Sequence, residues 1–467
     1  MGFFRYRELD ELRADIAARG VGVPLADELA PLAGPARVGR RALANRMAVH
    51  PMEGCDGNPG GTPGELTVRR WRRFAEGGAA LLWGEATAVV PEGRANPRQL
   101  VVSRETLPEL RRLVAETRAA RRAAWGTDDG FLIGMQLTHS GRWSHPAPII
   151  ARHGAALDAL KHTEDVPAID DAALEALEQR FVEAAALARE AGFDFVDVKQ
   201  CHTYLLNELL GARERPGRYG GTFENRTRFV RNVFEGIRAR LGDDLLLATR
   251  LNVFDGVPWR REASGAGAPA PREAPYAGAW GARPDAPETP ALEEPLRLIA
   301  ELRARGLALL NVTMGSPYFN PHLGRPFERA PVDGYAAPEH PLDGVARHFA
   351  LTSAVQRAQP DLPVIGTGYS WLRHFAAHAG AANVAAGDVT LFALGRGAIA
   401  YPRFAADVLE GRGMRRDESC LGVSYCTALM RAKDHPLGQR PAGCVPRDRL
   451  YAEEWQSLVR GSSVAGR

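Results

Sequence analysis

Short runs of apolar residues recur along the chain, and each is followed by a longer segment with helical periodicity. The runs are rich in branched side chains and nearly continuous, as in parallel strands that are buried on both faces. Eight such runs occur, at residues 46–50, 81–86, 131–137, 193–199, 245–251, 307–313, 362–367 and 389–394. Each run is predicted to be a strand of one parallel sheet.

The segments between the runs space their apolar residues three and four positions apart. Residues 173–192 and 224–242 show this pattern and end at glycine, which commonly terminates a helix, and residues 292–306 repeat it. Strand–helix alternation repeated eight times predicts a (β/α)8 TIM barrel. An open doubly wound sheet is the alternative. Its dinucleotide pattern G-x-G-x-x-A occurs at 395–400, but no strand–helix–strand unit follows, so the barrel is favoured.

Two segments fall outside this alternation. Residues 257–291 are rich in Gly, Ala and Pro and follow the fifth strand, on the side where barrel active sites form. They are predicted to be a lid, a substrate loop or a disordered segment. Residues 411–467 follow the eighth unit and hold three of the five cysteines. We therefore expect a barrel domain at 1–410 and a C-terminal extension at 411–467.

Composition and charge narrow the classes of function. The 467 residues are 45% hydrophobic and 25% charged, which excludes disordered, collagen-like and coiled-coil proteins. With 59 basic and 56 acidic residues, the formal net charge is +3. This balance gives no electrostatic reason to expect nucleic acid or an anionic membrane as a partner. A small-molecule substrate is expected, and a homo-oligomer remains open.

The N-terminal residues and the cysteine content indicate where in the cell the protein is expected. No apolar run reaches the ~18 residues of a membrane helix, and the N-terminus lacks the apolar core of a secretory signal. Five cysteines are too few for a disulfide scaffold. A soluble, cytoplasmic protein is therefore expected. Nearly all basic residues are arginine, and lysine occurs only at Lys161, Lys199 and Lys433, which draws attention to each of them.

Polar residues gather at the predicted carboxyl ends of the strands, where barrel enzymes place their active sites. Glycines with Arg396 at the ends of the seventh and eighth strands suit a phosphate group. Gln136 suits a ring with alternating C=O and N–H groups, and Arg250 suits an anionic ring edge. The loop at 199–204 supplies proton donors. Together these residues predict a phosphorylated heteroaromatic cofactor over the barrel mouth.

Longer motifs surround these positions. They are NRMAVHPMEG (45–54), GEATAVVPEGR (84–94), GMQLTHSGRW (134–143), HTYLLNELL (202–210), RYGGTFENRTRF (218–229) and VTLFALGRGAIAYPRF (389–404). With them the chain resembles the Old Yellow Enzyme family of NAD(P)H:flavin oxidoreductases, from about residue 30 to 467. The resemblance implies a barrel that binds FMN noncovalently and takes hydride from NAD(P)H.

The resemblance also implies roles for individual residues. Those implied to contact the flavin ring are Pro51, Met52, Glu53, Ala86, Gln136 and Arg250, and those implied to hold its phosphate are Gly368, Gly395 and Arg396. The family's substrate-binding pair at the end of the fourth strand corresponds to Lys199 and His202, and its proton-donating tyrosine to Tyr204. These three residues are the predicted catalytic residues.

The chain departs from the family pattern at Lys199. The family has His there, whereas a lysine brings a full positive charge and no hydrogen-bond acceptor. Lys199 would favour an oxyanion or a carboxylate over a neutral carbonyl. Alternatively, Lys199 forms an ion pair with Asp197, which lies two residues earlier on the same face of the strand.

A second departure concerns the C-terminal cysteines. The larger family members related to 2,4-dienoyl-CoA reductase carry C-x2-C-x2-C and a further Cys, which hold an iron–sulfur cluster. Here Cys420, Cys426 and Cys444 remain, and Val423 occupies the second ligand position. Three thiolates do not complete the usual site, so a cluster is not expected and metal binding is the minor alternative. The chain, ending at 467, is also expected to lack the appended FAD and NAD(P)H domains.

These observations predict an FMN-dependent NAD(P)H oxidoreductase of the ene-reductase type, which reduces an activated C=C bond. A lyase or aldolase that forms a Schiff base through Lys199 is one alternative. A non-catalytic flavin-binding barrel is another. Amine oxidation also remains open, although it needs covalent flavin or a complete cluster, and Val423 counts against the cluster.

Overall fold

The computed structural model describes residues 2–465, so the first residue of the predicted barrel domain and the last two of the predicted extension lie outside it. Eight parallel strands form one sheet. In spatial order they are β13 (Val364–Ile365), β12 (Leu307–Thr313), β7 (Leu246–Asn252), β6 (Phe195–Val198), β5 (Leu132–Thr138), β4 (Leu81–Ala88), β3 (Met47–Val49) and β14 (Phe392–Leu394). A parallel bridge between Ile365 and Leu391 joins the two ends of this sheet. The predicted barrel and its eight strands are confirmed, and the open sheet is excluded.

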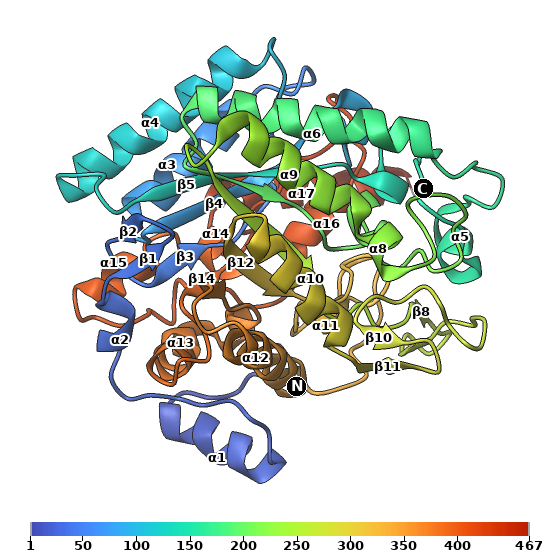
Figure 1. Ribbon diagram of the computed structural model, residues 1–467. Coiled ribbons are helices and arrows are strands. Elements are labelled where there is room, and N and C mark those ends of the chain that lie inside the picture. Colours follow the sequence, from blue (N-terminus) through green and yellow to red (C-terminus); the bar gives the residue numbers. More distant parts are fainter. Residues whose placement is uncertain (1, 466–467) are drawn as a thin grey trace.

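Helices form the outer layer around the strands (Figure 1). The main ones are α3 (Glu65–Glu76), α4 (Leu107–Trp125), α6 (Asp171–Ala191), α9 (Arg228–Leu241), α10 (Glu293–Ala304), α12 (Pro341–Ala358) and α13 (Ala376–Ala385). Shorter helices are α1 (Leu9–Arg19), α2 (Ala30–Ala33), η1 (Pro91–Gly93), α7 (Leu205–Leu210), α11 (Pro321–Gly324), η3 (Tyr369–Phe375), α14 (Arg396–Ala400) and α15 (Phe404–Leu409). Their apolar faces pack against the strands in one large core.

Two of the predicted helices show how local sequence sets helix ends. Helix α6 ends at Gly192, whose φ of 96° suits glycine, as predicted. The segment predicted as one helix at 224–242 is instead divided into α8 (Phe223–Arg226) and α9. The division falls at Thr227, whose hydroxyl donates a hydrogen bond to the carbonyl of Phe223 over 2.8 Å. Such a bond competes with the helical backbone pattern.

The interior of the barrel is filled by apolar side chains from alternating strand positions, including Trp83 and Phe195. An N-terminal hairpin formed by β1 (Ala36–Val38) and β2 (Arg41–Leu43) adds its apolar residues to the same cluster. The hairpin covers the end of the barrel where the strands begin. The carboxyl ends of the strands therefore lie at the opposite end, which is where the cavity described below opens.

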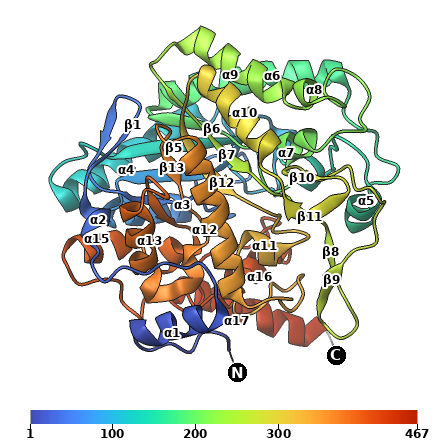
Figure 2. The same cartoon turned by 60° about the horizontal axis from the view of Figure 1, so that its bottom comes forward.

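The Gly-, Ala- and Pro-rich segment 257–291 is folded. It forms two antiparallel strand pairs, β8 (Trp259–Arg261) with β9 (Gly267–Pro269), and β10 (Ala282–Arg283) with β11 (Ala286–Pro290). These lie beside α5 (Ala155–Lys161) in both views (Figures 1 and 2). Arg152 joins the two regions, because its Nη2 donates to the carbonyl of Gly278 over 2.9 Å. The prediction of a disordered segment is thus wrong.

Residues after 410 pack against the barrel through α16 (Tyr425–Arg431), α17 (Arg449–Ala465) and the loop between them. The backbone N–H of Ala442 donates to the carbonyl of Gly54 over 2.7 Å, just after β3. Asp448 binds Arg69 and Arg73 of α3 over 2.8 and 2.7 Å. The extension therefore forms a wall beside the strand ends, and its boundary at 410 stays a prediction. No helix between residues 2 and 465 has the length and apolar character needed to cross a membrane.

Candidate active site

A cavity of about 220 Å³ lies at the carboxyl ends of the barrel strands. All twelve residues that the sequence assigned to cofactor and substrate line it. They are Pro51, Met52, Glu53, Ala86, Gln136, Lys199, His202, Tyr204, Arg250, Gly368, Gly395 and Arg396. The structure therefore brings these residues together from seven different strand ends, while their individual roles stay predictions.

The floor of the cavity is organised by the buried carboxylate of Asp197. Its Oδ2 accepts hydrogen bonds from Gln136 Nε2 over 2.6 Å and from Trp83 Nε1 over 2.8 Å. Its Oδ1 accepts from the backbone N–H of Arg250 over 2.7 Å. Burial raises the pKa of Asp197, and these donors oppose that rise. One carboxylate thus fixes both residues predicted for the pyrimidine edge of the ring.

Lys199 lies in the cavity without an ion-pair partner. No described carboxylate lies within 4.0 Å of any lysine in residues 2–460, so the alternative ion pair with Asp197 is wrong. The three donors already on Asp197 explain why. The ammonium instead lies 3.5 Å from the centroid of the Tyr204 ring. Burial, together with the nearby charge of Arg250, lowers the pKa of Lys199 to about 8.

The turn after β6 directs His202 and Tyr204 into the cavity. His202 and Thr203 have φ values of 66° and 55°, a left-handed conformation that costs ~1–3 kcal/mol for such residues. The turn is held by its surroundings: Asn207 Oδ1 accepts from the N–H of Thr203 over 2.7 Å, and Trp143 Nε1 donates to its carbonyl over 3.1 Å. Burial lowers the pKa of His202 far below its ordinary value, so its imidazole is neutral.

Glu53 places a carboxyl group beside the same cavity. It accepts hydrogen bonds from Asn96 Nδ2 over 2.5 Å and from Gln99 Nε2 over 3.4 Å. Burial and the neighbouring Glu85 carboxylate raise the pKa of Glu53 to about 7. Near neutral pH this group therefore exchanges between its charged and protonated forms.

The opposite end of the cavity is strongly basic. Arg396 Nη2 donates to the carbonyl of Pro326 over 2.8 Å, whereas its buried Nη1 has no partner. Arg325 Nη1 donates to Thr427 Oγ1 over 2.6 Å, whereas its buried Nε and Nη2 have none. Burial and the charge of Arg396 lower the pKa of Arg325. Two guanidinium groups with unused donors suit a phosphate.

Glycine is required beside this basic end. Gly368 has a φ of 93°, and a Cβ there would lie 2.8 Å from Cβ of His348. A Cβ on Gly395 would lie 2.9 Å from Sδ of Met52. The backbone can approach a ligand closely here only because these side chains are absent.

Sequence analysis assigned no role to several lining residues. They are His50, Tyr318, Arg325, Thr367, Ser370, Met430 and Arg431. Tyr318 and Arg325 follow β12, so their position in a loop after a barrel strand was the available signal. Met430 and Arg431 belong to α16 of the extension, and no local pattern connects them with the barrel.

The three C-terminal cysteines line a second, smaller cavity of about 20 Å³, together with Val423. Burial raises the pKa of Cys420 and of Cys444, which disfavours their thiolate forms. Among the residues described, no group of three or more His, Cys, Asp or Glu side chains is arranged to hold a metal ion. The structure therefore gives no support to a metal site at Cys420, Cys426 and Cys444.

Solved structures share this fold. A 2-naphthoyl-CoA reductase in complex with 2-naphthoyl-CoA superposes with a TM-score of 0.66 at 19% identity, over 91% of this chain and 58% of that chain. An old yellow enzyme homologue from Zymomonas mobilis superposes with a TM-score of 0.56 at 19% identity, over 83% of this chain and 94% of that chain. At these identities the likeness concerns the fold.

Curated relatives match part of the chain. An NADPH dehydrogenase of Geobacillus sp. (strain WCH70) is 33% identical over 207 residues, which is 42% of this chain and 56% of the relative. A 4,4'-dithiodibutanoate disulfide reductase of Rhodococcus erythropolis is 29% identical over 235 residues, which is 48% of this chain and 54% of the relative. The chain thus spans little more than half the length of these relatives.

A family profile matches the half of the chain that contains most of the predicted motifs. The match covers residues 31–266, from the N-terminal hairpin to β8. It includes the turn after β6 and the buried Asp197 contacts beneath it. The chain belongs to the NADH:flavin oxidoreductase / NADH oxidase family.

Proposed function

We propose that this chain is an FMN-dependent NAD(P)H oxidoreductase that reduces an activated C=C bond in a small molecule. The observation that carries the proposal is the set of unused donors at the two ends of one cavity. Nε of Arg250 at one end, and nitrogens of Arg325 and Arg396 at the other, are buried without partners. FMN carries a polar ring edge and a phosphate that would use both ends.

The residues present fit this group. Gln136 would face the ring edge with its amide, since only one of its N–H groups is occupied by Asp197. Arg250 would add a fixed positive charge beside it. Arg325 and Arg396 would hold the phosphate, with the backbone near Gly368 and Gly395. FMN, when bound, supplies hydride transfer between NAD(P)H and the acceptor.

The chain's own residues would then bind and polarise the acceptor. His202, as a neutral imidazole, would donate one hydrogen bond to the activating oxygen, and the Lys199 ammonium would add positive charge beside it. These groups stabilise negative charge on that oxygen, which is commonly the largest catalytic contribution. They are held in place before the acceptor arrives, by the turn after β6.

A proton donor for the acceptor carbon lies in the same cavity. Tyr204 lines the cavity, and its hydroxyl is hydrogen-bonded to that of Tyr318 over 3.0 Å. Tyr204 would give a proton to the α-carbon, and Tyr318 would restore it. Burial raises the pKa of Tyr204 well above its ordinary value, so the donor is protonated at neutral pH.

The absorbance spectrum of the purified protein, before and after anaerobic NAD(P)H, tests the proposal. We expect flavin absorbance that NAD(P)H bleaches and that an enone or enal restores. A colourless protein that does not take up FMN would contradict the proposal. Inactivation by borohydride in the presence of substrate would favour the Schiff-base alternative at Lys199. A yellow protein that NAD(P)H does not bleach would favour a non-catalytic barrel.

A further inference from the structure

Lys199 lines the cavity, and the two other lysines of this arginine-rich chain, Lys161 and Lys433, lie close enough to residues that line it to interact with their charges. Lys199 follows β6, Lys161 is the last residue of α5, and Lys433 lies two residues after α16. The ammonium of Lys161 lies 5.4 Å from the ring centroid of Trp143, and the ammonium of Lys199 lies 3.5 Å from that of Tyr204. Two of these lysines therefore each lie beside an aromatic ring.

Tyr318 connects these aromatic rings into a row. Its ring is stacked on Trp143, with centroids 3.8 Å apart and an interplanar angle of 12°. It is also stacked beside Tyr204, at 6.2 Å and 25°. The guanidinium of Arg431 lies 4.7 Å from the Tyr318 centroid. We call Trp143, Tyr318 and Tyr204 the aromatic row. Each of its three rings has one cation beside it.

At the outer end of the row, neither Lys161 nor Lys433 has a carboxylate of the described residues within 4.0 Å, whereas Arg431 is paired. Lys433 Nζ donates to the neutral Gln439 Oε1 over 2.5 Å, and Arg431 binds the exposed Asp333 over 2.6 Å. Burial and the charges of Arg431 and Lys433 lower the pKa of Lys161. Cations that repel one another at a cavity mouth attract anionic ligands.

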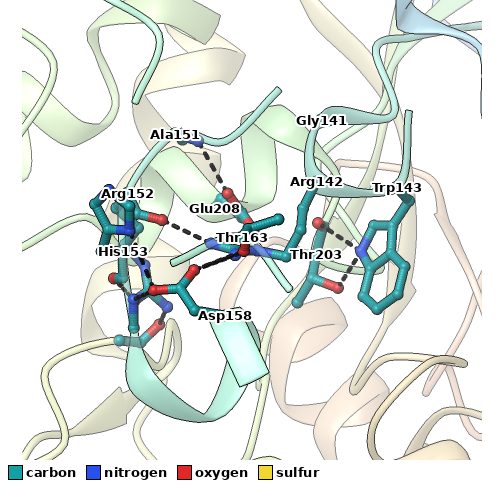
Figure 3. A network of polar contacts seen from close by, with 12 residues as sticks. Gly141, Arg142, Trp143, Ala151, Arg152, His153, Asp158, Thr163, Thr203 and Glu208 are labelled. Atoms are coloured by element: carbon teal, nitrogen blue, oxygen red, sulfur yellow. Dashed lines mark hydrogen bonds and ion pairs between the residues drawn. The ribbon is translucent and has the colours of Figure 1, made fainter. Parts of the chain in front are cut away.

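Figure 3 shows how Arg142 links the segment that carries Trp143 to the segment at 158–163 that contains Lys161. The fully buried Arg142 donates from Nη1 to Asp158 Oδ1 and to Thr163 Oγ1, both over 2.5 Å. These two residues flank Lys161 along the chain. Trp143 directly follows Arg142 and is itself bound to Thr203. The segments that carry Lys161 and Trp143 therefore share one anchor.

We propose that Lys161, Arg431 and Lys433 form a recognition site for an anionic group, a carboxylate or a phosphate, on a ligand whose reacting end lies beside Lys199 and His202. The inference rests on the proposed function, which places the reacting end there. The aromatic row lies between the two ends and suits a flat, conjugated ligand. The anionic group belongs either to the nicotinamide reductant or to the acceptor.

Two matched pairs of ligands test this site in the flavin-loaded protein. NADPH and NADH differ by one phosphate, and 4-carboxycinnamaldehyde and cinnamaldehyde differ by one carboxylate. Stopped-flow absorbance gives the Kd of each, from the concentration dependence of flavin bleaching or reoxidation. The test variant is Lys161→Gln with Lys433→Gln. The control is Arg240→Gln, an exposed residue near the end of α9, at the opposite end of the barrel.

We expect the charged member to bind at least ~5-fold more tightly in one pair, because two cations at the surface each contribute modestly. The double variant should reduce that preference to less than ~2-fold, because the remaining Arg431 is paired with Asp333, and should change the Kd of the neutral member less than ~2-fold. Arg240→Gln should retain it. The pair that shows the preference identifies the source of the anionic group, and the preference should weaken with salt.

Equal Kd values in both pairs, or a preference that survives in the double variant, would overturn this inference but not the proposed function. Bleaching and reoxidation would still proceed in that case, and the proposed function would stand. A protein without flavin absorbance, or one that NAD(P)H does not bleach, would overturn the proposed function and this inference with it. Thermal unfolding of each variant checks that the substitutions leave the fold unchanged.

Discussion

The side-chain amide of Gln136 donates a hydrogen bond over 2.6 Å to Oδ2 of Asp197, a carboxylate with no exposed surface. The other oxygen of that carboxylate accepts the backbone N–H of Arg250. The positions of two residues predicted to contact the flavin therefore depend on one side chain that does not itself line the cavity. Asp197 is a positioning residue, and its contribution is measurable separately from that of Gln136.

Replacing Asp197 by asparagine should weaken both the fold and flavin binding. The amide has the same shape, but both oxygens of the Asp197 carboxylate accept hydrogen bonds. The NH2 group of asparagine would therefore face an N–H donor in place of one of these oxygens. A buried donor left without a partner costs ~1–3 kcal/mol. Urea unfolding should show a loss of this size, and FMN titration a weaker Kd. The exposed Asp361→Asn should change neither; unchanged FMN affinity in Asp197→Asn would remove its positioning role.

Substitution of Arg325 by methionine should weaken binding of FMN but not of riboflavin, which lacks the phosphate. Hydrogen bonds to a charged group contribute ~1.5–3 kcal/mol, which corresponds to roughly 10- to 150-fold in Kd. Arg396→Met should act in the same direction, because its Nη1 is also unused. Fluorescence titration of the flavin-free protein with each flavin measures both affinities. An equal loss of affinity for riboflavin would show that the two arginines do not bind the phosphate group.

Glu53 should make the flavin-free protein less stable as the pH rises toward neutrality. Its pKa is raised from 4.5 to about 7 in the folded state. The folded protein therefore holds this proton more tightly than the unfolded chain does, and the stabilisation is lost as the pH rises through about 7. Urea unfolding at several pH values should show wild type losing stability relative to Glu53→Gln between pH 4.5 and 7. A constant difference over that window would contradict the prediction.

Lys199→Met should leave FMN bound and lower the rate with the electron acceptor, by about 10- to 1000-fold if its charge stabilises the developing oxyanion. In wild type the acceptor half-reaction should decline above pH 8, because the pKa of Lys199 is about 8 and the neutral amine lacks the charge. Lys199→Arg keeps the charge and should flatten this decline. Stopped-flow reoxidation of the reduced protein measures the rate, and unaltered acceptor kinetics in Lys199→Met would remove Lys199 from the mechanism.

Local sequence predicted strand positions well and side-chain partners poorly. The apolar run at 307–313 coincides with β12, because a strand buried on both faces needs a continuous apolar segment. The spacing of Asp197 and Lys199 places them on one face of the predicted strand at 193–199, yet β6 ends at Val198 and the two side chains are not partners. Gln136 and Arg250 bind the carboxylate from the flanking strands β5 and β7, and Trp83 binds it from β4, one strand further away. Those contacts depend on sheet register.

The amino-acid pattern by itself predicted a barrel whose strand ends carry glycines and arginines suited to a phosphorylated cofactor. Burial on both faces makes the strands continuously apolar, and the strand–helix alternation is visible as local periodicity. Only the tertiary structure showed that Arg325 completes the basic end of the cavity and that Arg431 reaches it from the extension. It also brought Lys161 and Lys433, which are far apart in the sequence, close to Arg431. Such neighbours come from segments far apart in the chain, and their proximity follows from barrel closure and packing, which no local pattern encodes.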